Sequence, residues 1–424
     1  MIGTDVHQRL GFLITSLDGG GAERVVSTLS EALVERRRSL LLLEDEMVYP
    51  FDGDVHVLDV PILDNRSRYE KLWNMFRAVA ALRGARQRLQ LDVCVSFLTW
   101  PNLFNILSAT GDRTIISVRN NPSRALRGPF APVLKTLIRT LYPRADHIVA
   151  ISQDVRRDLI ESFRVDPSQI STIYNPIRVD RVQRRATDSL PAPLASLPDH
   201  PTIITVGRLA IQKGHWHLVR AFRRVRDQFD AGRLVILGVG PFRDYLIGLA
   251  RNLQLTVWAH DEPNDAPPLD HDVIFWGFDD NPFPIVSACD VFAFPSLWEG
   301  LGNVLLESLA CGLPVASADC RSGPREILAP QTPLHQQIDH PEWAEYGVLL
   351  PVCDGQRYDH TAPLTDGERI WADVLSRLLA NPPLRRRYAR RGQHRAADFH
   401  IDHISDQWRR LLDDTAIRRC PTGT

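Results

Sequence analysis

The sequence predicts an α/β protein built from two doubly wound domains in tandem, and three observations support this prediction. The chain has 424 residues, which is too many for one ordinary hydrophobic core. Short apolar, β-branched runs alternate with helical patterns, as in parallel βαβ units. This pattern is interrupted once, by RATDSLPAPLASLPDHP at 185–201, whose composition is typical of a linker, and then resumes.

Six apolar runs precede the interruption and six follow it. Those before it are LGFLITSL (10–17), LLLLE (40–44), VHVLDV (55–60), VCVSFL (93–98), TIISVR (114–119) and HIVAIS (147–152). Those after it are TIITVGRL (202–209), RLVILGVG (233–240), DVIFWGF (272–278), VFAFPS (291–296), LPVASAD (313–319) and GVLLP (347–351). We expect each run to contain a strand of a parallel sheet.

Proline and aspartate mark two inserts in the second half, at 260–272 and 329–343, where we expect no regular structure. The segment from about residue 370 to 412 is helical in pattern and basic. The predicted domains are an N-terminal domain at 1–185, a linker at 186–200, a C-terminal domain at 201–398 and a final helical segment at 399–424 that packs near the N-terminal domain.

Charge and cysteine content exclude several classes of protein. The formal net charge is −1, with +5 in residues 1–185 and −6 in the remainder, a mild asymmetry that hints at an anionic partner for the first half or at chance surface composition. The six cysteines show no ligand or disulfide spacing. No run reaches the roughly 18 to 20 apolar residues of a membrane span. We therefore expect a cytosolic or peripheral protein.

The stretch SLWEGLGNVLLESLACGLPV, at 296–315, follows a predicted buried strand and contains two glutamates eight residues apart. Glu299 falls in the turn at the carboxyl end of the strand, where open α/β sheets bind ligands. Asn303 is predicted to cap the next helix, which places Glu307 in its second turn. Two carboxylates would then flank backbone N–H groups suited to a phosphate, or else be ordinary surface acids near a helix N-terminus.

A second group of polar residues lies about ninety positions upstream, in VGRLAIQKGHWHLVRAF at 206–222. Arg208 follows the predicted strand and Lys213 opens the predicted helix. Two cations at the carboxyl end of a strand suit a diphosphate, because arginine offers a planar fork and lysine a point charge. Alone they are equally compatible with a solvated loop, but they share one sheet edge with the acidic turn.

Several motifs, taken in their order along the chain, resemble those of retaining GT-B glycosyltransferases of family 4. The C-terminal motifs are GRL…KG (207–214), GVGP (238–241), WGF (276–278), FPSLWEGLGNVLLE (294–307), ACGLPV (310–315) and GPREI (323–327). The N-terminal motifs, which look like the branch that builds bacterial surface polysaccharides and lipid-linked oligosaccharides, are DGGGAERVV (18–26), SVRNNP (117–122), IVAISQDVRRDL (148–159) and IYNPI (173–177). The resemblance implies two Rossmann-like domains facing a cleft.

The resemblance also implies a role for each matched residue. Arg208 and Lys213 would bind the donor diphosphate, Glu299 the donor sugar and Glu307 the ribose. The remaining donor-binding residues would be Gly20, Gly21, Gly207, Gly240, Gly277, Phe278, Gly300, Leu301, Gly302, Asn303 and Val304. Many relatives carry a histidine near the reacting sugar, where this chain has Arg119, Asn120 and Asn121 on the acceptor side. The acceptor-activating group is therefore left open.

The implied function is retaining transfer of a sugar from a nucleotide-sugar, with UDP favoured by the family branch, to a glycan or lipid-linked glycan. Neither a metal nor a cofactor is expected, because DGD (52–54) and DHD (270–272) fit solvated turns. A nucleic-acid partner is not expected either. The alternatives are a sugar-nucleotide epimerase or phosphorylase on the same fold, and a non-catalytic partner in glycan assembly.

The segment 69–90 combines basic and apolar residues in a helical pattern. It could rest on anionic lipid near a lipid-carried acceptor, with Leu72, Phe76, Val79 and Leu82 on its apolar side. The alternative is an ordinary helix that packs on the sheet. The protein is accordingly expected in the cytoplasm, either free or peripheral at the inner face of the plasma membrane.

Overall fold

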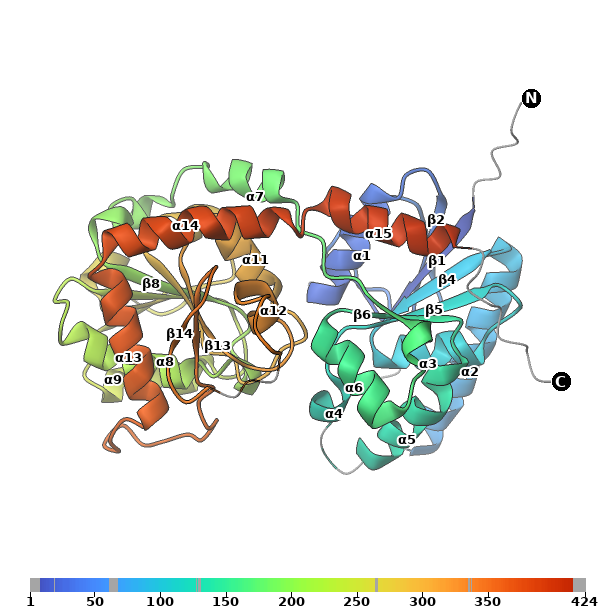
Figure 1. Ribbon diagram of the computed structural model, residues 1–424, viewed down its shortest axis with the longest axis horizontal. Helices are drawn as coiled ribbons and strands as arrows, with labels where there is room; N and C mark the ends of the chain where they lie inside the picture. The colour runs from blue at the N-terminus through green and yellow to red at the C-terminus, as the bar shows by residue number, and fades with distance from the viewer. Residues whose placement is uncertain are drawn as a thin grey trace. The chain divides into compact units, whose positions relative to one another are not determined.

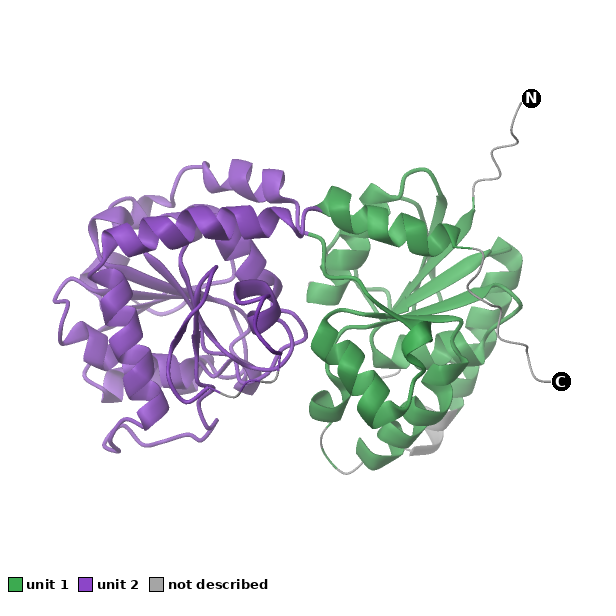
Figure 2. Ribbon diagram, viewed as in Figure 1, with its two compact units in different colours: residues 1–176, 401–424 green, residues 177–400 purple. Residues whose placement is uncertain are grey.

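The structure, a computed structural model, describes residues 8–18, 20–60, 68–126, 128, 131–263, 266–334, 336 and 338–414, with the backbone alone described at 68–72. The chain divides into two compact units (Figure 2). Unit 1 is Met1–Pro176 together with Ile401–Thr424, and unit 2 is Ile177–His400. Many of the helices and strands of each unit are labelled in Figure 1.

Unit 1 is built on a seven-stranded parallel sheet of order β3-β2-β1-β4-β5-β6-β7. Its strands are β1 (Arg9–Ile14), β2 (Arg37–Leu42), β3 (Asp54–Val57), β4 (Val93–Phe97), β5 (Arg113–Val118), β6 (His147–Ala150) and β7 (Ile170–Thr172). Its helices are α1 (Gly21–Ala32), α2 (Arg68–Leu89), α3 (Thr99–Leu107), α4 (Pro122–Ala125), α5 (Ala131–Leu141), α6 (Gln153–Phe163) and α15 (Ile401–Asp413).

Both faces of the unit 1 sheet are covered, because successive side chains of a strand point to opposite faces. Phe12 and Ile14 of β1 pack in one cluster with residues of α1 and with Trp408 of α15. Leu13 of the same strand packs in a second cluster with Leu82 of α2 and residues of α3. Helix α15, from the end of the chain, is thus part of the core of unit 1.

Unit 2 is built on an eight-stranded sheet of order β10-β11-β9-β8-β12-β13-β15-β14, parallel except for β14. Its strands are β8 (Thr202–Val206), β9 (Arg233–Leu237), β10 (Val257–Ala259), β11 (Val273–Gly277), β12 (Val291–Phe294), β13 (Val315–Ala318), β14 (Glu342–Trp343) and β15 (Val348–Leu350). Its helices are α7 (Val179–Ala186), α8 (His215–Arg226), α9 (Arg243–Asn252), α10 (Phe283–Ser287), α11 (Asn303–Ala310), α12 (Pro324–Leu328), α13 (Asp366–Leu379) and α14 (Pro382–Ala397).

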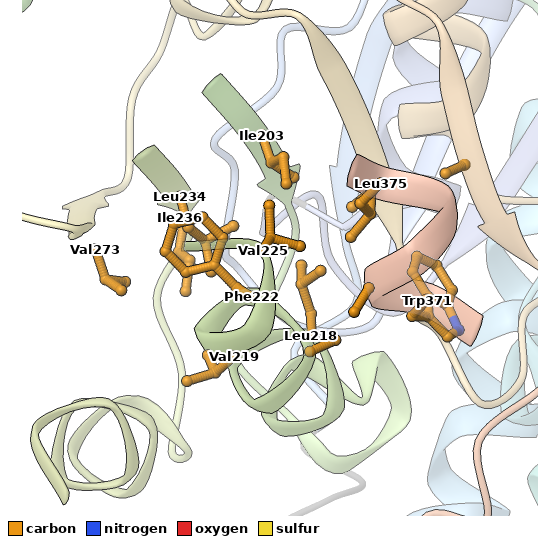
Figure 3. Packing of buried hydrophobic residues seen from close by; sticks show 14 of the residues in the cluster. Ile203, Leu218, Val219, Phe222, Val225, Leu234, Ile236, Val273, Trp371 and Leu375 are labelled. Atoms are coloured by element: carbon orange, nitrogen blue, oxygen red, sulfur yellow. The ribbon is translucent and has the colours of Figure 1, made fainter. Parts of the chain in front are cut away.

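The main core of unit 2 lies where α8 and α13 meet the sheet (Figure 3). Phe222 and Val225 of α8 face Ile203 and Ile236 of the central strands, and Trp371 of α13 packs beside them. All five side chains are at most 1% exposed. This packing holds β8 and the start of α8 in place, which is where the predicted cations lie.

The predicted fold of two doubly wound α/β domains is confirmed, but the boundary between the units differs from the predicted one. Unit 1 ends at Pro176, and the segment 186–200, predicted as a linker, belongs to unit 2. There Leu194 and Leu197 belong to two short 3-10 turns and are fully buried, and these turns also contain prolines. At the other end unit 1 resumes at Ile401, two residues after the predicted position.

The two inserts also contain more structure than predicted. The first includes a 3-10 turn at Pro268–Asp270. The second ends in β14, which pairs antiparallel with β15 through Glu342 and Trp343. Two residues of strand are too few to show a periodic pattern, so this element leaves no signal in the sequence.

Candidate active site

The turn after β8 carries the two predicted cations. Gly207, with a φ of +154°, leads out of the strand, and Arg208 follows with an exposed side chain. A 3-10 turn at Ile211–Lys213 ends at Gly214, whose φ is +60°. A Cβ at position 214 would lie 2.5 Å from the carbonyl oxygen of Pro295. Glycine therefore lets this turn lie directly against the loop after β12.

An ion pair between Lys213 and Glu299 lies at the centre of the site. Lys213 Nζ is 2.7 Å from Glu299 Oε1, and the two side chains are 17% and 7% exposed. The ammonium also lies 5.1 Å from the ring centroid of Phe294. Gln212 Nε2 donates to the other oxygen of Glu299 at 3.2 Å and to the Trp298 carbonyl at 2.9 Å. The structure thus joins the two motifs that the sequence shows separately.

The loop after Glu299 leads into α11, which begins differently from the prediction. Gly302, not Asn303, is the N-cap, and Asn303 is the first helical residue. The φ of Gly302 is +87°, which glycine adopts without strain. A glycine cap supplies no side-chain acceptor, so the first turn of α11 is left without a side-chain cap. Such a helix start suits an anion.

The predicted donor-binding residues on either side of this cap lie in the loop before α11 and in its first two turns. Gly300 and Leu301 are buried in the loop before it, and Val304 is partly buried in the first turn of α11. Glu307 lies one turn further on and is also partly buried. Its charge adds to burial in raising the pKa of the Cys311 thiol to about 12.

Glycines also form the neighbouring turns at the carboxyl ends of the strands. A Cβ on Gly238 would lie 2.0 Å from the carbonyl oxygen of Gly207, and one on Gly240 would lie 2.5 Å from that of Leu209. Both glycines have a φ above +140°. The turns after β8 and β9 therefore pack backbone to backbone, which brings Gly240 beside the loop that carries Arg208.

The turn after β11 presents an aromatic side chain to solvent. Gly277 has a φ of +86°, and a Cβ there would lie 2.6 Å from the ring of His260. Phe278, the next residue, is 70% exposed. Because β11, β9, β8 and β12 are parallel neighbours, these turns all lie at one edge of the unit 2 sheet.

The predicted glycine-rich loop of unit 1 leads directly into helix α1. Gly20 is its N-cap and Gly21 its first residue, while Gly19 lies outside the described residues. A Cβ on Gly20 would lie 2.2 Å from Oε2 of Glu23, so the glutamate folds back over the glycine. Glu23 is 9% exposed, and burial raises the pKa of its carboxyl group.

Arg119 lies at the carboxyl end of β5 and is 6% exposed. Its guanidinium donates to Ser117 Oγ at 3.3 Å and to Asn175 Oδ1. It also lies 5.5 Å from the ring centroid of Phe97. Burial lowers the pKa of Arg119 to about 9, and the charge of Glu23 opposes that change. The predicted acceptor-side residue Arg119 is thus a buried arginine held by contacts within unit 1.

The other two predicted acceptor-side residues have different surroundings. Asn120 is exposed, whereas Asn121 is buried and donates from Nδ2 to Asp154 Oδ2 at 3.2 Å. The local sequence did not indicate that Glu23 and Gln212 belong to these sites. Each stands within a few residues of a predicted position, which is the only signal that could have identified them.

His215 follows Gly214 at the start of α8 and is another residue that the sequence pattern did not indicate. It is 2% exposed, and burial together with the charge of Lys213 lowers the pKa of its imidazole to about 3. The ring is therefore neutral at neutral pH and adds no charge beside Lys213. Within the described part of the chain, no group of three or more His, Cys, Asp or Glu side chains could hold a metal ion.

This arrangement can bind an anion and hydroxyl groups together. A lysine ammonium has three N–H donors, and Glu299 occupies one of them. Arg208 and the first turn of α11 add donors at the same edge of the sheet. Glu299 and Glu307 supply carboxylates, and a carboxylate accepts hydrogen bonds from neutral hydroxyl groups.

Two family patterns match the chain in succession. Residues 19–181 match the pattern described as Glycosyltransferase Family 4, and residues 200–345 match that described as Glycosyl transferases group 1. A relative from Campylobacter jejuni, N-acetylgalactosamine-N,N'-diacetylbacillosaminyl-diphospho-undecaprenol 4-alpha-N-acetylgalactosaminyltransferase, is 30% identical over 399 residues, or 92% of this chain and 96% of the relative. An uncharacterized glycosyltransferase from Methanocaldococcus jannaschii is 30% identical over 318 residues, or 74% of each chain.

Solved structures share the fold at lower identity. The Anabaena protein HepE, in complex with UDP, has a TM-score of 0.69 and 17% identity, covering 96% of this chain and 99% of its own. WaaG, a glycosyltransferase involved in lipopolysaccharide biosynthesis, has a TM-score of 0.66 and 14% identity, covering 96% of this chain and 100% of its own.

Proposed function

This chain is a glycosyltransferase of family 4 with the GT-B fold, and we propose that it transfers a sugar from a UDP-sugar to a lipid-linked glycan. The Lys213–Glu299 pair carries the proposal, because it places a diphosphate-binding cation and a hydroxyl-binding carboxylate in direct contact. UDP is favoured because HepE, which has the same fold, was solved with UDP. A lipid-linked acceptor is favoured because the name of the Campylobacter relative specifies an undecaprenol-linked sugar.

In the proposed donor complex, Lys213 and Arg208 hold the diphosphate together with the first turn of α11. Glu299 keeps one N–H of Lys213 and accepts from the sugar hydroxyls through its remaining lone pairs. Glu307, one helical turn above the N-terminus of α11, accepts from the ribose. The glycine turns at 207, 240 and 277 leave room for the nucleotide to approach the backbone.

We propose that transfer retains the anomeric configuration. The bond from the sugar to the diphosphate breaks as the acceptor hydroxyl arrives on the same face, through an oxocarbenium-like state. Negative charge then develops on the leaving oxygen, and the fixed charges of Lys213 and Arg208 stabilise it. Glu299 is already bonded to Lys213 and Gln212, which suits a positioning role better than that of a nucleophile.

In the same proposal, the acceptor binds to unit 1 near Arg119 and Glu23, which are two charged residues buried there. Neither a metal nor a cofactor takes part, because Lys213 and Arg208 supply the positive charge that a cation would bring. Among the described residues, no helix combines the length and the apolar character needed to cross a bilayer. A lipid-linked acceptor would bring the enzyme to the cytoplasmic membrane surface as a peripheral protein.

The test is the thermal midpoint of the purified chain with UDP, GDP and ADP. We expect UDP to raise the midpoint, since a ligand that binds the native state stabilises it. Lys213→Met keeps most of the side-chain stem and should abolish the increase. Lys135→Met is the matched control, because Lys135 lies in α5 of unit 1 and donates to the Ser123 carbonyl. The absence of a shift with any nucleotide would argue for a non-catalytic relative.

A further inference from the structure

Helix α2 of unit 1 turns a continuous aromatic and basic face to solvent. Trp73 and Phe76 are 66% and 65% exposed, which is unusual for side chains of this size. Arg77 and Arg83 are exposed as well. At 3.6 residues per turn, these four positions fall within an arc of about 120° of the helix surface. They form one stripe about 15 Å long, at a rise of about 1.5 Å per residue.

The opposite side of α2 is fixed in the core. Ala78, Leu82 and Ala85 are buried in a cluster with strand residues of the sheet. Arg86, which is fully buried, donates from Nε to Asp112 Oδ2 at 2.8 Å. The helix is therefore held from behind, and its stripe cannot turn inward without breaking this packing.

This orientation differs from the one that the sequence predicts. The pattern places Phe76 on the apolar side together with Val79 and Leu82, yet it lies on the exposed side. Arg86, one of the basic residues of the segment 69–90, is not on the surface but is buried and paired with Asp112. The side chains of Lys71 and Leu72 lie outside the described residues. The apolar side binds the sheet, and the aromatic side is the one left to meet a partner.

The composition of the stripe favours an anionic lipid surface. Tryptophan and phenylalanine insert at the boundary of headgroups and acyl chains, and arginine attracts anionic headgroups. The one acidic residue of α2 in the sequence is Glu70, near the start of the helix, and residues 71–90 contain no aspartate or glutamate that would oppose such a surface. A second copy of this face would instead place Arg77 and Arg83 against the same arginines, which is unfavourable.

We propose that the stripe of Trp73, Phe76, Arg77 and Arg83 docks unit 1 on an anionic lipid bilayer. Phe76 and Trp73 enter the interface, and the two guanidinium groups contact lipid phosphates beside them. This inference deepens the proposed function, since docking would bring the enzyme to a lipid-linked acceptor. Binding to vesicles is measured without any sugar donor, so the two proposals can fail separately.

The experiment is co-flotation of the full chain with phosphatidylcholine vesicles that contain or lack phosphatidylglycerol. We expect binding to the anionic vesicles, weakened by salt because the Debye length shortens. Trp73→Ser with Phe76→Ser should weaken binding at least ~10-fold. Arg77→Gln with Arg83→Gln should weaken it ~5-fold for each arginine.

The matched control removes two exposed arginines from unit 2. Arg386 and Arg390 lie in α14 and are exposed, so their change to glutamine alters net charge equally. If the control weakens binding as much as the α2 arginines do, the attraction is a general charge effect and the proposal is wrong. Binding equal to wild type in the Trp73→Ser, Phe76→Ser variant would overturn it too. A far-UV circular dichroism spectrum and a thermal midpoint, both measured without nucleotide and both equal to wild type, show that each variant is folded.

Insertion itself is tested by brominated lipids, which quench tryptophan in the interface. The chain has nine tryptophans, so the signal of one must be isolated. Trp73→Phe keeps an aromatic side chain and should retain binding but lose most of the quenching. Quenching that is unchanged in this variant would place another surface on the membrane. A concentration-dependent dimer that dissociates in the Phe76→Ser variant would identify a second copy as the occupant instead.

Discussion

The Lys213–Glu299 pair should contribute to the stability of unit 2 in a way that a double-mutant cycle can measure. At 2.7 Å and an effective dielectric constant of about 20, the gross attraction is about 6 kcal/mol. Desolvation of side chains that are only 17% and 7% exposed offsets most of it. Lys213→Met leaves Glu299 with the weaker donor Gln212, so we expect a loss of about 2 kcal/mol.

The companion variant, Glu299→Gln, should cost less. Its amide oxygen can still accept from Lys213, which is the more exposed partner, so a loss of about 1 kcal/mol is expected. The double variant should be scarcely less stable than Lys213→Met, giving a coupling free energy of about 1 kcal/mol. A unit of this size shifts its thermal midpoint by about 2–4 °C per kcal/mol, so calorimetry resolves these differences.

The cycle also separates structure from ligand binding. Glu299→Gln should retain a UDP-induced rise in the midpoint, because the phosphate contact belongs to the lysine. Lys213→Met should lose it. Additive effects of the two substitutions, with a coupling free energy of zero, would show that the side chains do not interact and that the pair has no part in stability.

Three further predictions concern other parts of the chain. Asp112→Ala should destabilise unit 1 by about 3 kcal/mol in denaturant unfolding, because it leaves the buried Arg86 guanidinium without its carboxylate. Gly238→Ala should cost at least about 3 kcal/mol, since its Cβ would lie 2.0 Å from the Gly207 carbonyl, and a folded, equally stable variant would contradict this close packing of the two turns. The pKa of His215, lowered from 6.5 to about 3, makes the folded state favour the neutral ring, so stability should fall by up to about 1.4 kcal/mol per pH unit as pH drops from 6.5 toward 3. His215→Gln should flatten that part of the stability profile, and an unchanged profile would show that the imidazole is not buried.

Hydrophobic periodicity predicted most of the fold. Each of the twelve apolar runs overlaps a strand, because buried parallel strands read as continuous apolar segments. The elements that were missed are two or three residues long, as at Ile170–Thr172, Val257–Ala259 and Glu342–Trp343. Such short strands exist because a neighbouring strand pairs with them, which is information from elsewhere in the chain.

The site was predictable in its parts but not in its contacts. Arg208, Lys213 and Glu299 stand in local motifs, so the sequence alone proposed each of them as a candidate site residue. The bond between Lys213 and Glu299 joins positions 86 residues apart, and sequence spacing carries no distance of that kind. Likewise, the cap at Gly302 depends on a φ of +87° that is set by packing of the loop.

The helix α2 shows the same limit for a surface. Its pattern correctly indicated a helix that carries several basic residues. The side that meets the sheet carries Leu82 and also Arg86, which pairs with Asp112 inside unit 1, whereas Phe76 lies in solvent. Tertiary contacts thus decided which face became the surface.

The most direct test of the proposed function is transfer of labelled sugar from UDP-sugars to polyprenyl-diphosphate-linked glycans, with product anomers assigned by NMR. We expect a product of retained configuration, formed equally with and without EDTA. We also expect a loss of about 10²-fold or more in turnover for Lys213→Met but not for Lys135→Met. Turnover of UDP-sugar without acceptor, or full activity in Lys213→Met, would contradict the proposed transfer.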